Sequence, residues 1–363
     1  MILRYTAVII ISCLFTYILF WPVVKFGLFF RIFDKSKLQN NTSKKIVRIG
    51  GLSLFFGLLI SLLISDWFDW LDLINSKFIY CSLIGSFSAC LIGLIDDIWS
   101  ISPFPRLIFQ AFIGAFFWQT LFKIEVIDLS IFPFLSKYNL SPFFSLFITV
   151  FLIVAIINCF NWQDGLDGLC SGVTLISSVG FALAIFAISS HSIEIIYILT
   201  VAGVCLGFLL HNYNPAKIFM GDSGSYFLGL NAAIFAFTSY GNLINSNYSK
   251  FSILIPICIL FLPLMDMAYV IFSRLLEGRS PFFPDTRHFH YKLMRIGITH
   301  SESVLICYVL NQFFIASVLG LIFVQYRLLL PISISLVLLF LFKKSKKINI
   351  WYGNFKHRKL IRK

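Results

Sequence analysis

Long apolar runs separated by polar segments dominate this sequence, and they decide what the chain can fold into. A helix needs about 20 apolar residues to cross a bilayer. Eleven such runs lie near residues 5–24, 48–65, 77–95, 107–122, 143–160, 169–190, 193–211, 225–240, 251–272, 302–325 and 327–342. We therefore expect an all-α, polytopic integral membrane bundle of about eleven transmembrane helices, with ten as the alternative count.

Composition supports a membrane location. Hydrophobic residues make up 59% of the 363 residues and charged residues only 12%, whereas soluble domains carry roughly a quarter of charged residues. The eight cysteines are scattered through the apolar runs without a CxxC pair or a metal-ligand spacing, so we interpret them as core residues. The first run is not followed by a small-residue cleavage site, which predicts a retained span.

Basic residues predict the orientation, because loops rich in Lys and Arg stay in the cytoplasm. All but six of the 29 Lys and Arg residues fall in one set of alternate loops; the exceptions are Arg4, Lys77, Lys123, Lys137, Lys250 and Arg327. We expect a plasma-membrane protein with its N-terminus outside, one catalytic domain over residues 1–342 and a basic cytoplasmic tail over 343–363. Contact with anionic lipid accounts for the net charge of +13 without any nucleic acid.

Acidic residues gather at the predicted cytoplasmic ends of the runs. The five are Asp96, Asp97, Asp164, Asp167 and Asp222. Carboxylates close to hydrocarbon are costly, and neighbouring carboxylates repel one another, so the arrangement needs a cation or a basic group. The pattern predicts an active site on the cytoplasmic face.

Two of these segments carry paired aspartates. Asp96 and Asp97 end one run, ahead of Arg106; adjacent aspartates can divide the roles of cation ligand and base, whereas a helix cap with a snorkelling Arg is the simpler alternative. Asp164 and Asp167 are each followed by glycine, and their i, i+3 spacing places both carboxylates on one side of a helical turn. A plain turn is the alternative there.

A third segment runs from His211 to Ser225 and contains Asp222. Hard oxygen ligands such as the Asp222 carboxylate and the Asn161 amide suit Mg²⁺, and Mn²⁺ can substitute for it. A Gly- and Ser-rich loop with a capping aspartate is the competing interpretation.

The fourth segment, residues 277–293, is basic. His288 and His290 stand beside Arg279, Arg287 and Lys292, which together favour a diphosphate or a sugar. Zinc is the alternative for the histidine pair, but a third ligand is missing nearby. Asp266 lies inside an apolar run, where it is either a site residue or a partner of Arg274.

Taken in order, the four segments resemble the polyprenyl-phosphate N-acetylhexosamine-1-phosphate transferase superfamily (glycosyltransferase family 4). The resemblance covers roughly residues 34–293 and is most specific at Asn158–Leu169 and Asn214–Ser225. The segment Pro284–Leu293 and the apparent eleventh run look closer to the WecA and TagO type than to the MraY type.

The resemblance implies a UDP-activated N-acetylhexosamine donor, an undecaprenyl phosphate acceptor, Mg²⁺ and release of UMP, at the start of a cell-wall polysaccharide or lipopolysaccharide. N-acetylglucosamine is the first expectation, a modified deoxy-N-acetylhexosamine the alternative, and a homodimer is compatible with the family. Residue by residue, it implies Asp222 and Asn161 at Mg²⁺, Asp96 and Asp97 at the lipid phosphate, Asn212 and Phe219 at uracil, Asp164 and Asp167 near the nucleotide, and His288 and His290 at sugar and phosphate. Lys217, Arg106 and Arg287 complete the expected binding set.

Departures from the family pattern occur at three places. Arg106 stands where Lys is common, and Tyr291 where another His is frequent. In the first loop, Asp34 and Arg48–Gly51 keep the register, but Ser36, Gln39 and Thr42 replace the expected Pro, Arg and His.

The expected mechanism is direct attack of the lipid phosphate on the β-phosphorus, with Asp97, or less favourably Asp96, accepting any proton. A covalent aspartyl intermediate is the alternative. A transporter is disfavoured because the charges cluster at one face and the acidic segments do not repeat. A scaffold would not need the carboxylates, and the Arg, Gly and Asp series of CDP-alcohol phosphotransferases is absent after Asp164.

Overall fold

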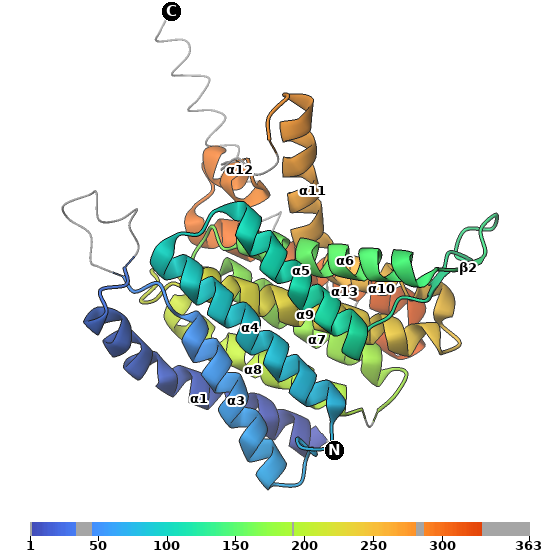
Figure 1. The fold of residues 1–363 in the computed structure, drawn as a ribbon, viewed down its shortest axis with the longest axis horizontal. Helices are drawn as coiled ribbons and strands as arrows, with labels where there is room; N and C mark the ends of the chain where they lie inside the picture. Colours follow the sequence, from blue (N-terminus) through green and yellow to red (C-terminus); the bar gives the residue numbers. More distant parts are fainter. Residues whose placement is uncertain (1, 34–45, 191, 281–286, 329–363) are drawn as a thin grey trace, which may run out of the picture.

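The computed structural model describes residues 2–33, 46–190, 192–280 and 287–328. Almost all of this part is helical, as Figure 1 shows. The helices are α1 Ile2–Phe29, α3 Gly51–Trp67, α4 Lys77–Trp99, α5 Pro103–Thr120, α6 Pro142–Gln163, α7 Leu169–Phe186, α8 Ile193–Asn212, α9 Gly221–Ile244, α10 Leu254–Ile259, α11 Phe261–Leu276, α12 Phe289–Arg295 and α13 His300–Ile322. Strands β1 Val126–Asp128 and β2 Lys137–Asn139 form an antiparallel hairpin between α5 and α6.

Membrane-crossing helices confirm the predicted all-α polytopic fold. Within the described ranges, seven helices are long and apolar enough to span a bilayer, or eight if the bent pair α10 and α11 counts as one span; α3 is a shorter apolar helix. Each of the first ten predicted runs overlaps a helix or that pair. The eleventh run and the basic tail lie outside the described residues apart from positions 327 and 328, so the count of eleven stays a prediction.

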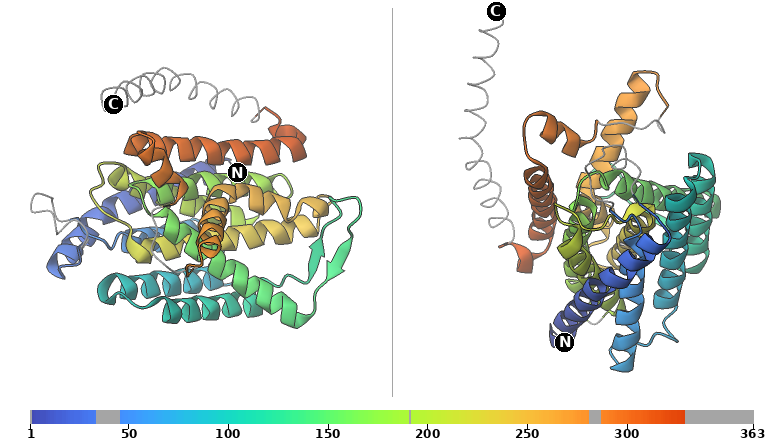
Figure 2. Two further views of the ribbon diagram at one scale, coloured as in Figure 1. Left: turned by 90° about the horizontal axis from the view of Figure 1, so that it is seen from above. Right: turned by 90° about the vertical axis from the view of Figure 1, so that its left-hand side faces the viewer.

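The run predicted as one span over 251–272 contains a break that the sequence interpretation did not include. Helices α10 and α11 meet at a 72° bend. Pro263, in the first turn of α11, lacks an N–H, and its ring would clash with the carbonyl of Ile259 in a continuous helix. Figures 1 and 2 show the result: α11 leaves the bundle and projects out of it, steeply inclined to the other helices, near α12.

Helix α9 forms the centre of the bundle and packs against α3, α4, α6, α7 and α10. Its first turns are rich in Gly and Ser, which let neighbouring helices approach closely. At Gly93 of α4, an added Cβ would lie 2.3 Å from the backbone oxygen of Asp222. This tight crossing brings the end of α4 onto the start of α9.

A polar network joins three helices in the buried interior. Tyr197 of α8 donates its hydroxyl to Asn231 Oδ1 of α9 at 2.7 Å, and Asn231 Nδ2 donates to Ser86 Oγ of α4 at 3.0 Å. All three side chains are fully buried. These bonds fix α4 against α9 and therefore help to set the positions of the acidic residues at their ends.

Candidate active site

The carboxylate of Asp97, at the end of α4, caps the first turn of α9. Its Oδ1 accepts the backbone N–H of Asp222 at 2.8 Å, and its Oδ2 accepts that of Ser223 at 3.0 Å. The first N–H groups of a helix have no partner within the helix and carry partial positive charge. Asp97 is thus held by α9, and Asp222 is placed directly beside it.

Arg48 bridges these two aspartates. Its Nε lies 3.3 Å from Asp97 Oδ1, and its Nη2 donates to Asp222 Oδ2 at 3.1 Å. The Asp97 side chain is fully buried and that of Asp222 is 17% exposed, while the Arg48 side chain is 41% exposed. Arg48 therefore offsets the negative charge of a buried carboxylate pair from the solvent side.

The sequence interpretation did not include Arg48 among the site residues. Its position follows from backbone pairing: Phe219 donates its N–H to Val47 O, and Gly50 donates to Phe219 O, both at 2.9 Å. The segment just before α3 thus lies along the segment just before α9. The retained register of Arg48–Gly51 was the available signal, but the replaced residues upstream made that loop look unreliable.

Asn161, in the last turn of α6, contacts the other side of Asp222. Its Nδ2 donates to Asp222 Oδ1 at 2.7 Å and to Ser225 Oγ at 2.9 Å. The predicted metal pair is therefore adjacent. In this arrangement the amide presents its N–H group, and ligation of a metal by its oxygen requires the amide to turn over.

Asp96 is buried and anchors α4 to α5 and α9. Its Oδ2 accepts from Arg106 at 2.6 Å and from the Tyr226 hydroxyl at 3.1 Å, and its Oδ1 accepts the N–H of Ile101 at 2.8 Å. A polar pocket of about 230 Å³ opens here, lined by Phe33, Arg48, Asp96, Asp97, Ser100, Ile101, Arg106 and Asp222. Two guanidinium groups and three carboxylates thus face one small cavity.

Asp164 follows α6 and differs from the other site aspartates. In the described part of the chain, its side chain has no hydrogen-bond or ion-pair partner. Burial raises the pKa of Asp164 well above its ordinary range; Arg48 opposes this, whereas the carboxylates of Asp222 and Asp97 add to it. A carboxylate in this position favours an added cation.

Asp167 has a different task, because it holds the loop before α9. Its Oδ2 accepts from Asn214 Nδ2 at 2.8 Å and from the N–H of Ala216 at 3.2 Å. Asn212 is buried, accepts the N–H of Gly168 at 3.0 Å and donates to Ile218 O at 2.9 Å. The polar groups of Asn212 thus connect two loops of the chain, and its contact with uracil stays a prediction.

The remaining predicted nucleotide contacts lie on the same loop. Phe219 is half-buried and pairs through its backbone with the segment at Arg48, whereas Lys217 is exposed and donates its N–H to His211 O at 2.8 Å. Both residues lie on the segment that leads into α9, and their contacts with the nucleotide stay predictions.

Asp266 of α11 contacts the segment that carries His288 and His290, which we call the histidine loop. One carboxylate oxygen contacts His288 Nδ1 at 2.8 Å, and the other accepts the N–H of Phe289, the first residue of α12, at 2.7 Å. Asp266 therefore caps α12 and orients the His288 ring. Arg274, the partner considered from the sequence, lies instead over the ring of Trp162, 4.9 Å from its centroid.

His290 stacks on His288, with ring centroids 5.5 Å apart. It is buried, and its Nε2 has no hydrogen-bond partner among the described residues. Burial lowers the pKa of His290 to about 4, so the ring is neutral at pH 7. Gly165 lies against this ring, since an added Cβ there would be 2.4 Å from Nε2. The histidine loop thus packs directly on the Asp164 segment.

Arg287 does not join this cluster in the structure. Its two terminal nitrogens contact the two carboxylate oxygens of Glu277 at 2.5 and 2.7 Å. This bidentate ion pair joins Glu277, at the end of α11, to Arg287, two residues before α12. A substrate contact by Arg287 stays a prediction that requires the pair to open.

The carboxylates of Asp222 and Asp164 suit a Mg²⁺ ion that is held partly by water and substrate. In the part of the chain that the structure describes, no three His, Cys, Asp or Glu side chains form a group able to hold a metal ion. Mg²⁺ does not need such a cage, because it keeps several waters and is commonly bound by one or two carboxylates together with substrate phosphates. Asp222, which opens to the pocket, and the unpartnered Asp164 fit that kind of site.

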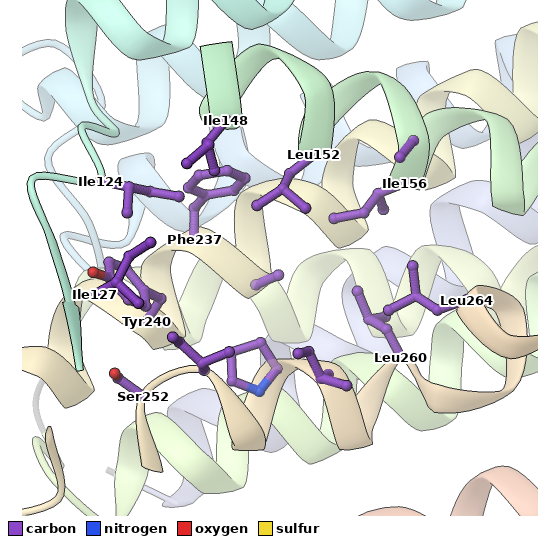
Figure 3. A pocket seen from close by; sticks show the side chains of 15 residues that line it. Ile124, Ile127, Ile148, Leu152, Ile156, Phe237, Tyr240, Ser252, Leu260 and Leu264 are labelled. Atoms are coloured by element: carbon purple, nitrogen blue, oxygen red, sulfur yellow. The ribbon is translucent and has the colours of Figure 1, made fainter. Parts of the chain in front are cut away.

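An apolar groove lies on the same helices farther into the bundle. Its volume is about 260 Å³, and Figure 3 shows Ile156 of α6 across from Leu260 and Leu264 beside the break, and Phe237 of α9 beside Ile148 toward the other end of the groove. Ile156 lies five residues before Asn161, about 8 Å along the helix. The groove therefore approaches the acidic end of the bundle along α6.

Comparison with known proteins identifies the family of this chain. A family model described as glycosyl transferase family 4 matches residues 79–240, which include all five site aspartates. The chain is 31% identical over 314 residues to a probable undecaprenyl-phosphate N-acetylglucosaminyl 1-phosphate transferase of Bacillus subtilis, covering 86% of this chain and 83% of that protein. It is 32% identical over 286 residues to a decaprenyl-phosphate N-acetylglucosaminephosphotransferase of Mycobacterium tuberculosis (72% and 68% covered). It is 29% identical over 279 residues to the undecaprenyl-phosphate alpha-N-acetylglucosaminyl 1-phosphate transferase of Escherichia coli (74% and 71%). The resemblance seen in the sequence is thereby confirmed, and this chain is a multi-pass membrane protein that belongs to glycosyl transferase family 4.

Proposed function

We propose that this enzyme transfers N-acetylglucosamine 1-phosphate from UDP-N-acetylglucosamine to undecaprenyl phosphate, releasing UMP and starting a cell-envelope polysaccharide. The three relatives carry names for this type of transfer and match most of the chain. The observation that carries the proposal is the meeting of Asp97, Asp222, Asn161, Arg48 and Arg106 around one end of the bundle.

The chemistry requires one anion to attack another. An oxygen of the lipid phosphate attacks the β-phosphorus of the donor, the bond to the α-phosphate oxygen breaks, and the electrons leave with UMP. Arg106 and Arg48 line the pocket and offset the charge of phosphate oxygens there. Mg²⁺, when bound, supplies further charge compensation at the diphosphate, and Asp222, Asp164 and a turned Asn161 amide are the residues that would hold it.

Asp97 is the proposed acceptor of any proton on the attacking phosphate. Its side chain is fully buried and both oxygens accept backbone N–H groups of α9, so neither oxygen is open to in-line attack on a phosphorus atom. This supports direct displacement over a covalent aspartyl intermediate. A phosphosugar trapped on Asp97 in the presence of the donor alone would reverse that preference.

The apolar groove supports the lipid part of the proposal. A polyprenyl chain is apolar and flexible, and a groove lined by Ile, Leu and Phe side chains between α6 and the α10–α11 break suits it. We further propose that the acidic end faces the cytoplasm of the plasma membrane, where the nucleotide donor is made, with the N-terminus outside. The excess of basic residues in the loops at this end supports that orientation.

A donor panel tests this proposal. Purified enzyme in liposomes containing undecaprenyl phosphate and Mg²⁺ is given UDP-N-acetylglucosamine, UDP-N-acetylgalactosamine or a deoxy-N-acetylhexosamine derivative, and the released nucleotide is measured. UMP release with N-acetylglucosamine is expected, and preference for the deoxy donor would replace the proposed sugar. Asp222→Ala should abolish release, whereas Asp72→Asn, an exposed position outside the site, should not. Absence of UMP release with every donor would overturn the proposal.

A further inference from the structure

The guanidinium of Arg48 occupies a position between Asp97 and Asp222 that the function proposed above would give to a cation. It contacts both carboxylates, at 3.3 and 3.1 Å, through two different nitrogens. Asp97 is fixed on its other side by two backbone N–H groups, whereas Asp222 has Asn161 as its further partner. Of the two, Asp222 is the carboxylate that can exchange its partner.

The backbone holds Arg48 in place from behind. Hydrogen bonds on both sides of it, from Phe219 N to Val47 O and from Gly50 N to Phe219 O, pair its segment with the entrance to α9. Its side chain is nevertheless 41% exposed, and it lines the polar pocket together with Arg106. The guanidinium can therefore turn from the carboxylates into the pocket while its Cα stays where it is.

We propose that Arg48 is an internal counter-ion: it neutralises Asp222 when no metal is bound, yields that carboxylate to Mg²⁺, and then contacts the phosphates of the bound substrate. The metal step rests on the carboxylate geometry, and the phosphate step rests on the proposed function. A divalent cation at Asp222 repels a guanidinium bound to the same carboxylate. The diphosphate offers the guanidinium anionic oxygens within the same pocket.

Competition between Arg48 and Mg²⁺ for Asp222 has a thermodynamic consequence. Mg²⁺ must compete with Arg48 for Asp222, so in the absence of substrate its apparent affinity is lowered by the strength of that ion pair. Removing the guanidinium should tighten Mg²⁺ binding even though it destabilises the metal-free protein. A residue that only supported the fold would not produce these two opposite changes.

The test is a Mg²⁺ titration without substrates, followed by thermal unfolding of the full chain in detergent. Arg48→Gln should unfold at a lower temperature than the wild type in EDTA, and its Mg²⁺ midpoint should fall on the order of tenfold, as expected for the loss of one nearby positive charge. Arg48→Lys, which keeps the charge but not the fork, should give an intermediate midpoint. Arg4→Gln, at an exposed position in the first turn of α1, is the matched control and should leave the Mg²⁺ midpoint unchanged.

An unchanged or higher Mg²⁺ midpoint in Arg48→Gln overturns the counter-ion proposal. If Arg48→Gln does not fold, an Arg48→Lys midpoint equal to or above that of the wild type overturns it. The phosphate step is tested separately by kinetics. UMP release by Arg48→Gln should fall at least tenfold in kcat at saturating Mg²⁺, and an unchanged kcat overturns that step. Failure of the wild type to release UMP would refute the proposed function without affecting the metal titration.

Discussion

Variants of Asp266 can show whether this residue orients the His288 ring for catalysis or only supports the fold. Its carboxylate accepts two N–H groups, from His288 Nδ1 at 2.8 Å and from Phe289 at 2.7 Å. Asp266→Ala leaves both donors without this acceptor in a mostly buried place, which costs about 1–3 kcal/mol for each donor. We expect the start of α12 to detach and turnover to be lost together with local stability.

Asp266→Asn is the sharper change, because it keeps the shape. The amide oxygen can still accept from Phe289, but the amide NH₂ then faces His288 Nδ1 and favours the opposite ring tautomer. The charge-assisted bond it replaces is worth about 1.5–3 kcal/mol, which corresponds to a loss of roughly ten- to a hundredfold in kcat/KM. The unfolding temperature should fall less than in Asp266→Ala, because the new amide still pairs with both groups.

The assay is UMP release with thermal unfolding measured on the same preparations. Asp72→Asn, which makes the same chemical change at an exposed aspartate, should behave as the wild type. Ring ¹⁵N shifts of labelled histidine would report the tautomer directly. The reasoning is refuted if Asp266→Asn retains activity within about twofold of the wild type, because the orienting bond would then have no catalytic effect.

Three further predictions concern packing and pH. Gly165→Ala should displace the His290 ring, whose Nε2 would lie 2.4 Å from the new Cβ, and should cut UMP release at least tenfold. Gly241→Ala is the control, because its new Cβ meets nothing within 4 Å. Equal activities of the two variants would contradict this packing. The pKa of His290 falls from 6.5 to about 4 on folding, so its neutral form contributes up to about 3 kcal/mol of stability, which is fully present above about pH 6.5 and is lost as the pH falls through 4. His290→Gln should flatten the dependence of the unfolding free energy on pH in this range. An unchanged pH dependence would exclude His290 as its source. Asn231→Ala removes the acceptor of the buried Tyr197 hydroxyl and should destabilise the protein by about 1–3 kcal/mol, measured by unfolding in mixed micelles; a change below about 0.5 kcal/mol would show that the network contributes little.

The helical fold was predictable because hydropathy at the scale of a bilayer is a local property of the sequence. The break between α10 and α11 was not predicted, although Pro263 was a visible signal, because apolar length alone continues through it. The break also explains Asp266. Once α11 leaves the bundle, this residue lies beside the histidine loop, and its partner is His288, not Arg274.

The acidic positions were predictable from the cost of charge beside hydrocarbon, but their division of labour was not. Asp97 and Asp167 accept backbone N–H groups of other segments, and Asp164 stands without such a partner. These differences depend on where segments distant in sequence meet. Arg48 was missed for the same reason, since its ion pairs bridge 49 and 174 positions along the chain.

The central claim is the transfer of a sugar together with its phosphate at the Asp97–Asp222 site, and position-specific labelling of the donor tests it most directly. UDP-N-acetylglucosamine labelled with ³²P in the β-phosphate is incubated with undecaprenyl phosphate, Mg²⁺ and the wild-type enzyme or Asp222→Asn, and the lipid is extracted. The account predicts that wild-type enzyme moves the β-label into the lipid, that an α-label stays in water as UMP, and that Asp222→Asn moves neither. A β-label that remains in water as UDP while the sugar enters the lipid, or full transfer by Asp222→Asn, would contradict it.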